Sequence, residues 1–347
     1  MLRAASRAAP RRFFTVAAVA PAHPLGFVFD IDGVLLRGGA PLPGAARALA
    51  RLDAARVPWL LLTNGGGEPE ARKAAALSRA LGTRIAPEQV VLSHTPMRAL
   101  CAALGDEKVL LLGCRDVRAV GAAYGLRRAF SAGDVHASDP AAYPFLPPPA
   151  GAASLTPADR AAPWGAVLVL HDPNSWGLEI QIAIDVLKSR GAGAPHVPLF
   201  CSNGDLTFAG AHAAPRLAAG AFEVALRAVW AATEGGAPPL EATFFGKPTA
   251  ATFDYAARAL AAWAGGGAVG AGGAAGAAGA AGAFARLVMV GDNPRADVRG
   301  ANAAGAPWTS VLVRSGMWAG EALAPGDEPH AVVDGVADAV ARELGGE

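Results

Sequence analysis

The sequence predicts an α/β protein with a Rossmann-like parallel sheet as its core and a second α/β unit inserted into that core. Short, fully apolar runs typical of buried strands alternate along the chain with longer amphipathic stretches typical of helices. This alternation favours a parallel sheet covered by helices. In addition, several apolar runs end abruptly at Asp, Thr or Asn, which predicts polar side chains at strand ends.

The first unit is predicted from two segments, residues 23–88 and 197–347. Its buried strands are expected at 26–29, 57–62, 197–201, 286–290 and 308–313. The helices between them are expected at about 44–56, 68–82, 215–233 and 248–262. Residues 264–283 are almost pure Ala and Gly, so they have too little surface to bury and are expected to be a disordered insertion.

The inserted unit is predicted over residues 89–196 and repeats the same alternation. Its strands are expected at 90–92, 109–112 and 166–170, and its helices at 97–104, 117–124 and 178–189. The Pro-rich stretch 139–163 is expected to be a long surface loop.

Residues 1–22 have the composition of an organellar transit peptide. They contain four arginines and no acidic residue, and the first acid of the chain is Asp30. The alternative is a disordered basic tail without a targeting role. Without those arginines the net charge of +1 becomes negative, so the body is mildly acidic and has no basic stripe for nucleic acid.

Length and composition also exclude some classes of protein. At 347 residues the chain can bury a sizeable core, and no apolar run approaches the roughly 20 residues that span a bilayer, so no transmembrane segment is predicted. Cys101, Cys114 and Cys201 lack the spacing of a zinc site or a disulfide scaffold. The cytosol or the mitochondrial matrix suits such thiols.

Asp30 and Asp32 are the first candidate site residues. Side chains at i and i+2 of an extended segment project the same way, and two converging carboxylates repel each other unless a cation lies between them. Mg²⁺ suits such oxygen ligands. Asp292 follows a predicted strand and supplies a further ligand, while Asn293 and Asp297 are expected to support it.

These residue types match the needs of phosphoryl transfer. A carboxylate nucleophile divides one hard displacement into two easier ones, and Asp32 is placed to give and take a proton. The transferring group carries negative charge, which the ammonium of Lys247 stabilises. Thr63, Asn64 and Gly65 follow another predicted strand and offer a hydroxyl, an amide and main-chain N–H groups.

Together these motifs resemble the haloacid dehalogenase-like hydrolases. The resemblance rests on four segments, which are 27–35, 62–64, 246–248 and 290–297. The insertion resembles the α/β cap of subfamily IIA. Residues 91–97 and 201–206 are also similar to the cat-eye-syndrome critical-region protein 5 branch. The run Gly65-Gly66-Gly67 departs from the family, which often has a bulkier residue there.

The resemblance implies a Mg²⁺-dependent phosphatase acting on a small phosphorylated metabolite. Asp30 would be the nucleophile and Asp32 the acid and base. Asp30, the main-chain carbonyl of Asp32 and Asp292 would bind the metal, while Thr63 and Lys247 would hold the phosphate. Relatives of this branch are usually mitochondrial, some of them loosely linked with glycerophospholipid metabolism, so the matrix is expected, with the cytoplasm as the alternative.

Other functions stay open at this point. Dehalogenase chemistry is rejected, because Asp32 and Asp292 would then have no task. A phosphotransferase remains possible, as does a binding or scaffold protein that keeps the fold with little turnover. His94 and His171 are expected to be structural or loop residues. The sequence leaves the substrate and the oligomeric state open.

Overall fold

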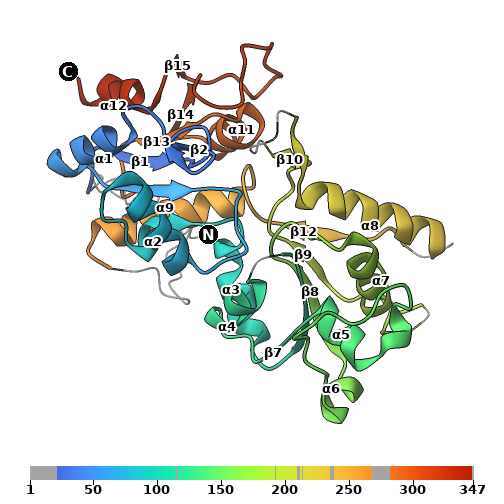
Figure 1. Cartoon of the computed structure of the whole chain (residues 1–347). Coiled ribbons are helices and arrows are strands. Elements are labelled where there is room, and N and C mark those ends of the chain that lie inside the picture. Colours follow the sequence, from blue (N-terminus) through green and yellow to red (C-terminus); the bar gives the residue numbers. More distant parts are fainter. Residues whose placement is uncertain are drawn as a thin grey trace, which may run out of the picture.

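The structure is a computed structural model, and it describes residues 22–345 except 115, 192, 209–211, 213, 235–237 and 268–281. It consists of two α/β units, seen at the upper left and lower right of Figure 1. Almost all of the predicted leader (1–22) and most of the predicted Ala/Gly insertion (264–283) lie outside the described residues. The α/β prediction, with parallel sheets, is confirmed.

The first unit contains a six-stranded parallel sheet within the described residues. Its strand order is β15 (Ala331–Val333), β14 (Trp308–Val313), β13 (Leu287–Gly291), β1 (Gly26–Phe29), β4 (Trp59–Leu62) and β5 (Val90–Val91). In the central pairing, Phe27 lies opposite Val288 of β13 and Trp59 of β4.

Helices cover both faces of this sheet because its strand residues point alternately to opposite sides. Phe27 and Phe29 pack with the helices α1 (Ala45–Ala54), α2 (Glu70–Leu81) and α12 (Val336–Leu344). Val28, between them, packs on the other face with α9 (Ala250–Ala264) and α11 (Arg299–Ala304). The sheet is therefore buried on both sides, as its uninterrupted apolar strands require.

The second unit repeats this three-layer plan around a five-stranded parallel sheet. Its strand order is β12 (Ala242–Phe244), β9 (Leu199–Cys201), β8 (Trp164–Val169), β6 (Lys108–Leu112) and β7 (Arg128–Ser131). One face packs against α5 (Ala132–Ser138), α7 (Trp176–Leu187) and α8 (Ala219–Thr233), and the other against α3 (Arg98–Leu104) and α4 (Val117–Ala123). The predicted loop 139–163 carries the short helix α6 (Pro157–Ala161).

Two strands belong to the other sheet from the one that the sequence predicts. Val90–Val91 pairs with β4 in the first unit, although 90–92 was expected in the insertion. Leu199–Cys201 pairs with β8 and β12 in the second unit, although 197–201 was expected in the first. The physical reason is that an apolar run identifies a buried strand but not its partner, which long-range pairing decides.

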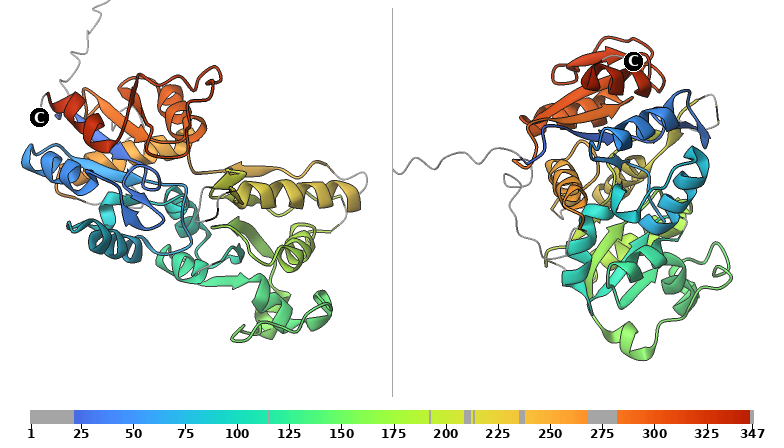
Figure 2. Two further views of the ribbon diagram at one scale, coloured as in Figure 1. Left: turned by 45° about the horizontal axis from the view of Figure 1, so that its top comes forward. Right: turned by 90° about the vertical axis from the view of Figure 1, so that its left-hand side faces the viewer.

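Two short antiparallel hairpins lie outside the sheets. One joins β2 (Leu36–Arg37) to β3 (Ala40–Pro41), directly after β1. The other joins β10 (Thr207–Phe208) to β11 (Arg216–Leu217), and it projects from the second unit toward the first in Figures 1 and 2.

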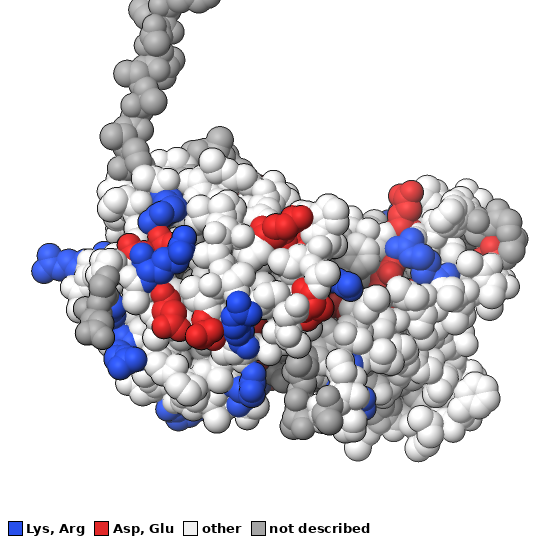
Figure 3. All heavy atoms as spheres, turned by 90° about the horizontal axis from the view of Figure 1, so that it is seen from above, with Lys and Arg blue, Asp and Glu red and all other residues white. Residues whose placement is uncertain are grey.

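One face of the molecule carries few charged side chains. On the face seen from above, acidic and basic side chains are interspersed and most of the surface is uncharged (Figure 3). Among the described residues, none of the helices combines the length and the apolar character that crossing a bilayer requires.

Candidate active site

The candidate site lies where the carboxyl ends of strands from both sheets approach one another. Asp30 follows β1, Thr63 follows β4, and Asp292 follows β13 of the first sheet. Lys247 and Asn203 instead follow β12 and β9 of the second sheet. The sequence predicted that Asp30, Thr63, Asn203 and Asp292 follow strands of one sheet, whereas the two units each contribute part of the site.

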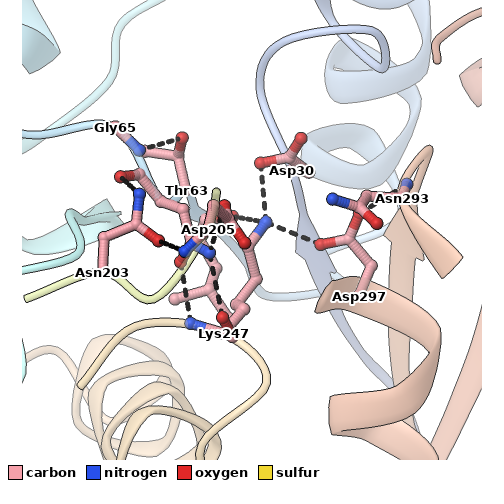
Figure 4. Close-up of polar contacts among 10 residues, drawn as sticks. Asp30, Thr63, Gly65, Asn203, Asp205, Lys247, Asn293 and Asp297 are labelled. Atoms are coloured by element: carbon pink, nitrogen blue, oxygen red, sulfur yellow. Dashed lines mark hydrogen bonds and ion pairs between the residues drawn. The ribbon is translucent and has the colours of Figure 1, made fainter. Parts of the chain in front are cut away.

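Lys247 lies at the centre of the polar contacts drawn in Figure 4. Its Nζ is 2.7 Å from Asp30 Oδ1, 2.6 Å from Asp297 Oδ1 and 2.9 Å from the carbonyl oxygen of Leu62. The side chain is 3% exposed. Burial by itself would lower the pKa of Lys247, but the carboxylates of Asp297 and Asp30 outweigh burial and raise it. Lys247 is therefore an ammonium ion in this site.

Three carboxylates converge beside Lys247. Oxygen atoms of Asp30, Asp292 and Asp297 all lie within 4.8 Å of one another, and the three side chains are buried. Burial raises the pKa of Asp292 well above its ordinary value, and the neighbouring Asp30 and Asp297 carboxylates raise it further. Burial likewise raises the pKa of Asp297 to about 6, against the opposing effect of Lys247.

This cluster fits a divalent cation. A single ammonium cannot balance three carboxylates, and burial makes the remaining repulsion costly. The donors are hard oxygen atoms, which Mg²⁺ prefers. Asp30, Asp292 and Asp297 are therefore the side chains that can hold the metal, whereas the carboxylate of Asp32 is exposed on the wall of the adjoining cleft.

The loop Thr63–Asn64–Gly65 is anchored by its own side chains. Thr63 Oγ1 accepts a hydrogen bond of 3.0 Å from the Gly65 amide. The Asn64 amide donates to Asp205 Oδ2 at 2.8 Å and to the Lys247 carbonyl at 2.9 Å, and its Oδ1 accepts from the Lys247 amide at 2.7 Å. The Asn64 side chain, expected to offer its amide to a phosphate, is thus engaged in holding Lys247 in place.

The glycines after this loop have a packing role that the sequence did not reveal. A Cβ at Gly66 would lie 2.8 Å from Ser93 Oγ and 2.9 Å from His94 Cδ2. Gly67 has φ +80°, and a Cβ there would lie 2.2 Å from His171 Cδ2. The imidazole rings of His94 and His171 therefore pack against this loop, and only glycine, which has no Cβ, leaves room for them.

Asn293 and Asp297 form one local unit. Asn293 Oδ1 accepts a hydrogen bond of 3.0 Å from the Arg295 amide, which caps the π-helical turn Pro294–Val298. Asp297 Oδ2 accepts from the Asn293 amide at 3.0 Å. A buried π-turn therefore orients the Asp297 carboxylate toward Lys247, and π-turns are frequent at functional sites.

A cleft of about 780 Å³ opens from the carboxylate cluster, within the size range of small-molecule sites. His171, which the sequence left as a loop residue, lines it from the end of β8. Asn203 and Asp205 also line it, and the long-range bond from Asn64 to Asp205 was not visible in the sequence. Lys73 and Arg216 were missed as well, because isolated cations carry no motif signal.

Comparison with family models gives two matches. Residues 27–127 match the haloacid dehalogenase-like hydrolase model. Residues 244–339 match a second model, described as HAD-hydrolase-like. The two matched segments contain all the residues of the carboxylate cluster together with Lys247 and Thr63.

The chain is also similar to characterised and solved proteins. It is 32% identical to a mitochondrial hydrolase of Saccharomyces cerevisiae, over 92% of this chain and 95% of that one. It is 32% identical to a cardiolipin synthase/mitochondrial hydrolase fusion protein of Schizosaccharomyces pombe, over 92% of this chain but about half (53%) of the relative. The fold resembles that of glycerol phosphate phosphatase Rv1692 from Mycobacterium tuberculosis, solved with magnesium, with a TM-score of 0.59, 22% identity, and coverage of 91% of this chain and 75% of that one.

Proposed function

The chain belongs to the haloacid dehalogenase-like hydrolases, and from this premise we propose that it is a Mg²⁺-dependent phosphatase that hydrolyses a small phosphomonoester through an aspartyl-phosphate on Asp30. Hydrolase activity follows from the family. The observation that carries the finer proposal is the buried carboxylate cluster of Asp30, Asp292 and Asp297 held against the Lys247 ammonium.

The first step forms a bond between a carboxylate oxygen of Asp30 and phosphorus and breaks the bond from phosphorus to the ester oxygen. Lys247 binds Oδ1 of Asp30 at 2.7 Å, so we assign the attack to Oδ2. Asp32, exposed on the cleft wall, donates its proton to the departing alkoxide. Lys247 places a positive charge 2.7 Å from Asp30 Oδ1, which reduces the repulsion between this carboxylate and the incoming phosphate.

The second step regenerates the enzyme. Asp32, now a carboxylate, takes a proton from a water molecule as the water oxygen attacks phosphorus. The bond between phosphorus and Asp30 breaks, which releases inorganic phosphate and restores both aspartates to their starting protonation states. The same residue thus serves as acid and then as base, and no further reactant is needed.

The residues around the reacting group have separate tasks. Asp30, Asp292 and the main-chain carbonyl of Asp32 would hold Mg²⁺, which when bound supplies positive charge that stabilises the transferring phosphoryl group. The buried Asp297, hydrogen-bonded within its π-turn, would orient the cluster. The Gly65 amide is engaged with Thr63 Oγ1. The Thr63 hydroxyl keeps its own hydrogen, so it is the donor proposed for the phosphate oxygens.

We propose that the second unit, from α3 (Arg98–Leu104) to β12 (Ala242–Phe244), is the cap that selects the substrate. Asn203 and Lys247 follow strands of its sheet and reach the site, and His171 lines one wall of the cleft. The fold similarity to the solved neighbour covers 91% of this chain and so includes this unit.

Phosphate release from a panel of phosphomonoesters tests the proposed reaction. Wild-type protein should release phosphate only with Mg²⁺, and Asp30→Asn should reduce kcat by at least about a thousandfold, as expected when a nucleophile is removed. Asp334→Asn, the same change at a surface carboxylate whose side chain is 90% exposed, is the matched control. Equal turnover by Asp30→Asn and wild type would exclude Asp30 as the nucleophile. Absence of turnover by wild type would favour a binding or scaffold role, and transfer to an added alcohol would favour a phosphotransferase.

We further propose a mitochondrial location, in the matrix. Both curated relatives carry the word mitochondrial in their names, which agrees with the basic, acid-free composition of residues 1–22. A fusion of residues 1–25 to a reporter should enter mitochondria, and a cytosolic reporter would contradict the proposal.

A link with glycerophospholipid metabolism is the most specific part of the proposal. It is supported by the relative in which a hydrolase like this chain is fused to a cardiolipin synthase. The panel above should therefore include phosphorylated glycerol and its phospholipid derivatives. Turnover confined to unrelated phosphomonoesters would remove this link and leave the phosphatase proposal intact.

A further inference from the structure

The cleft is lined by cationic side chains as well as by the carboxylate cluster. Three of these cations take no part in the proposed chemistry, which are Arg37 of β2 and Lys73 of α2 in the first unit and Arg216 of β11 in the second. Arg37 donates to the carbonyl oxygen of Ser315. Lys73 and Arg216 come from opposite units and line one cleft.

Lys73 is a half-buried cation. Within the described part of the chain its ammonium makes no ion pair or hydrogen bond, and two acids close to this part of α2 pair with other cations. Arg72 pairs with Asp116 at 3.0 Å, and Glu70 pairs with Arg98 at 3.1 Å. An ammonium that is partly removed from water without a counter-charge is destabilised, and an anionic ligand would remove that cost.

Arg216 is similarly available. Its Nε donates to the adjacent carbonyl of Pro215 at 3.0 Å, and no acidic partner contacts its guanidinium among the described residues. A guanidinium leaves several N–H donors for a ligand after one such bond.

Carboxylates of the cleft are committed to other groups. Asp172 Oδ1 accepts from the Ala219 amide at 2.7 Å, which caps α8. Asp205 binds Asn64 at 2.8 Å, and Asp292 Oδ2 accepts from the Met317 amide at 2.7 Å. Lys73 and Arg216 thus line the cleft without an acidic partner among the described residues, and their positive charges are open to an anionic ligand.

We propose that Lys73 and Arg216 are specificity-determining residues that recognise a second negative charge on the leaving group of the substrate. This inference rests on the proposed phosphatase function, because it assumes that the phosphate to be hydrolysed lies beside the carboxylate cluster. The substrate class is then a phosphomonoester that also carries a carboxylate or a second phosphate. A carboxylate and a phosphate both carry negative charge on several acceptor oxygens, and the two cations can bind either group through that charge.

Paired substrates test the proposal. The first pair is 3-phosphoglycerate and glycerol 3-phosphate, which differ by a carboxylate in place of a hydroxymethyl group. The second pair is the bisphosphate and the monophosphate of propane-1,3-diol. Wild-type kcat/KM should favour the anionic member of at least one pair by about tenfold or more, as a charge-assisted hydrogen bond allows. The pair that shows the preference distinguishes carboxylate from phosphate as the second anion.

Variants assign the preference to the two residues. Lys73→Gln should bring the ratio of kcat/KM within the preferred pair from about ten to about one, chiefly through KM, and Arg216→Gln should reduce it in the same direction. Arg79→Gln is the matched control, since it removes an exposed positive charge from the same helix at a position that does not line the cleft. Its ratio should equal that of wild type.

The outcomes separate this inference from the proposed function. Mg²⁺- and Asp30-dependent hydrolysis without a preference in either pair would overturn the inference and leave the phosphatase intact. A preference that Lys73→Gln and Arg216→Gln both retain would also overturn it. Absence of hydrolysis of every phosphomonoester would overturn both. Calorimetric binding of 3-phosphoglycerate to Asp30→Asn and to Asp30→Asn/Lys73→Gln gives a readout without turnover, and equal affinities would count against Lys73.

Discussion

Lys247 determines the electrostatics of the site at the scale of single residues. It is surrounded by Asp30, Asp297 and the Leu62 carbonyl, which come from three separate segments of the chain. The ammonium therefore reduces carboxylate repulsion and at the same time fixes the relative positions of those segments. Removing one partner from such a buried set leaves uncompensated charge, which costs more than the net contribution of the complete set.

Lys247→Met should lower the free energy of unfolding by about 3–5 kcal/mol at pH 8, the range for breaking a buried ion pair. The loss should be smaller at pH 5, because Asp297 already has a pKa raised to about 6 and protonation relieves the repulsion. Urea titrations at pH 5 and pH 8 measure this loss of unfolding free energy. Lys188→Met, at a lysine whose side chain is 48% exposed, should cost no more than about 1 kcal/mol at either pH. An equal loss at pH 5 and pH 8 would contradict the electrostatic explanation.

Gly33 shows how closely the backbone approaches the acid cluster. It has φ +85°, and a Cβ there would lie 2.2 Å from Asp292 Oδ2. Gly33→Ala should therefore displace Asp292 and abolish most of the proposed phosphatase activity. Gly39 has nearly the same dihedral angle, φ +84°, but nothing lies within 4 Å of its Cβ position. Gly39→Ala should cost about 1–2 kcal/mol of stability through backbone strain alone and keep its kcat. If Gly33→Ala and Gly39→Ala lose activity equally, backbone strain rather than the contact with Asp292 explains the effect of Gly33→Ala.

At the scale of elements, the two units are joined by a buried polar network next to the loop Gly65-Gly66-Gly67. Tyr124 of α4 donates to Glu70 of α2, and Thr95 Oγ1 donates to the same carboxylate at 2.8 Å. His94 Nδ1 lies 2.8 Å from the Tyr124 hydroxyl, and Arg98 of α3 pairs with Glu70. Because Tyr124 gives its proton to Glu70, His94 Nδ1 is the donor to Tyr124 in a neutral imidazole. The network links α2, the helix that follows the loop Thr63–Asn64–Gly65, to the second unit.

His94 should make folding stability depend on pH. Burial, the largest effect, lowers the pKa of His94 to about 4, with a smaller lowering by His171 and Arg98 and an opposing effect of Glu70. The unfolded chain binds a proton at this residue below about pH 6.5, but the folded chain does so only near pH 4. The free energy of unfolding should therefore fall by about 1.4 kcal/mol per pH unit as pH decreases across that window.

Denaturant titrations of wild type and His94→Asn between pH 7.5 and pH 4.5 measure this contribution. The free energy of unfolding of His94→Asn should decrease less steeply than that of wild type, by about 1.4 kcal/mol less per pH unit. His212→Asn, at an exposed histidine, should follow the wild-type slope. Parallel slopes for wild type and His94→Asn would show that His94 is not the titrating group.

At the scale of the whole molecule, the three carboxylates of the cluster converge only in the folded chain. Asp30 follows β1, whereas Asp292 and Asp297 lie more than 250 residues further along, after β13. Pairing of β1 with β13 brings them together. An ion that binds this cluster therefore binds the native state far better than the unfolded chain, so it should stabilise the fold by mass action.

Mg²⁺ should raise the midpoint of thermal unfolding in a concentration-dependent way. At a hundred times Kd the stabilisation is about 2.7 kcal/mol, and chelation should reverse it. Asp292→Asn should abolish the dependence on Mg²⁺, whereas Asp334→Asn should retain it. Equal stabilisation of both variants would mean that the ion binds elsewhere. Calorimetry without substrate measures this independently of turnover.

The sequence predicted much of the fold and several residues of the candidate site for a local reason. Apolar runs such as 26–29 and 308–313 are strands because fully buried segments need few polar side chains. Asp30, Thr63 and Asp292 could be placed at strand ends because each directly follows such a run. The helix predicted at 68–82 ends at Gly82, which adopts φ +63° in the structure.

The remaining features depend on contacts between distant segments. Neither the transfer of 197–201 to the second sheet nor the bonds from Asn64 to Asp205 and Lys247 could be inferred, because they join residues far apart in the chain. Lys73 and Arg216 are ordinary surface cations in the sequence and become notable only because one cleft exposes both.

The sequence by itself determined the α/β class, the family and the residue types of the site, because strand burial and motif spacing are properties of short segments. Only the tertiary structure decided which sheet each strand joins, how Lys247 is shared between two carboxylates and which side chains line the cleft. The physical reason is that strand pairing, burial and electrostatic coupling depend on distances in space. The order of residues along the chain does not fix those distances until the sheets have formed.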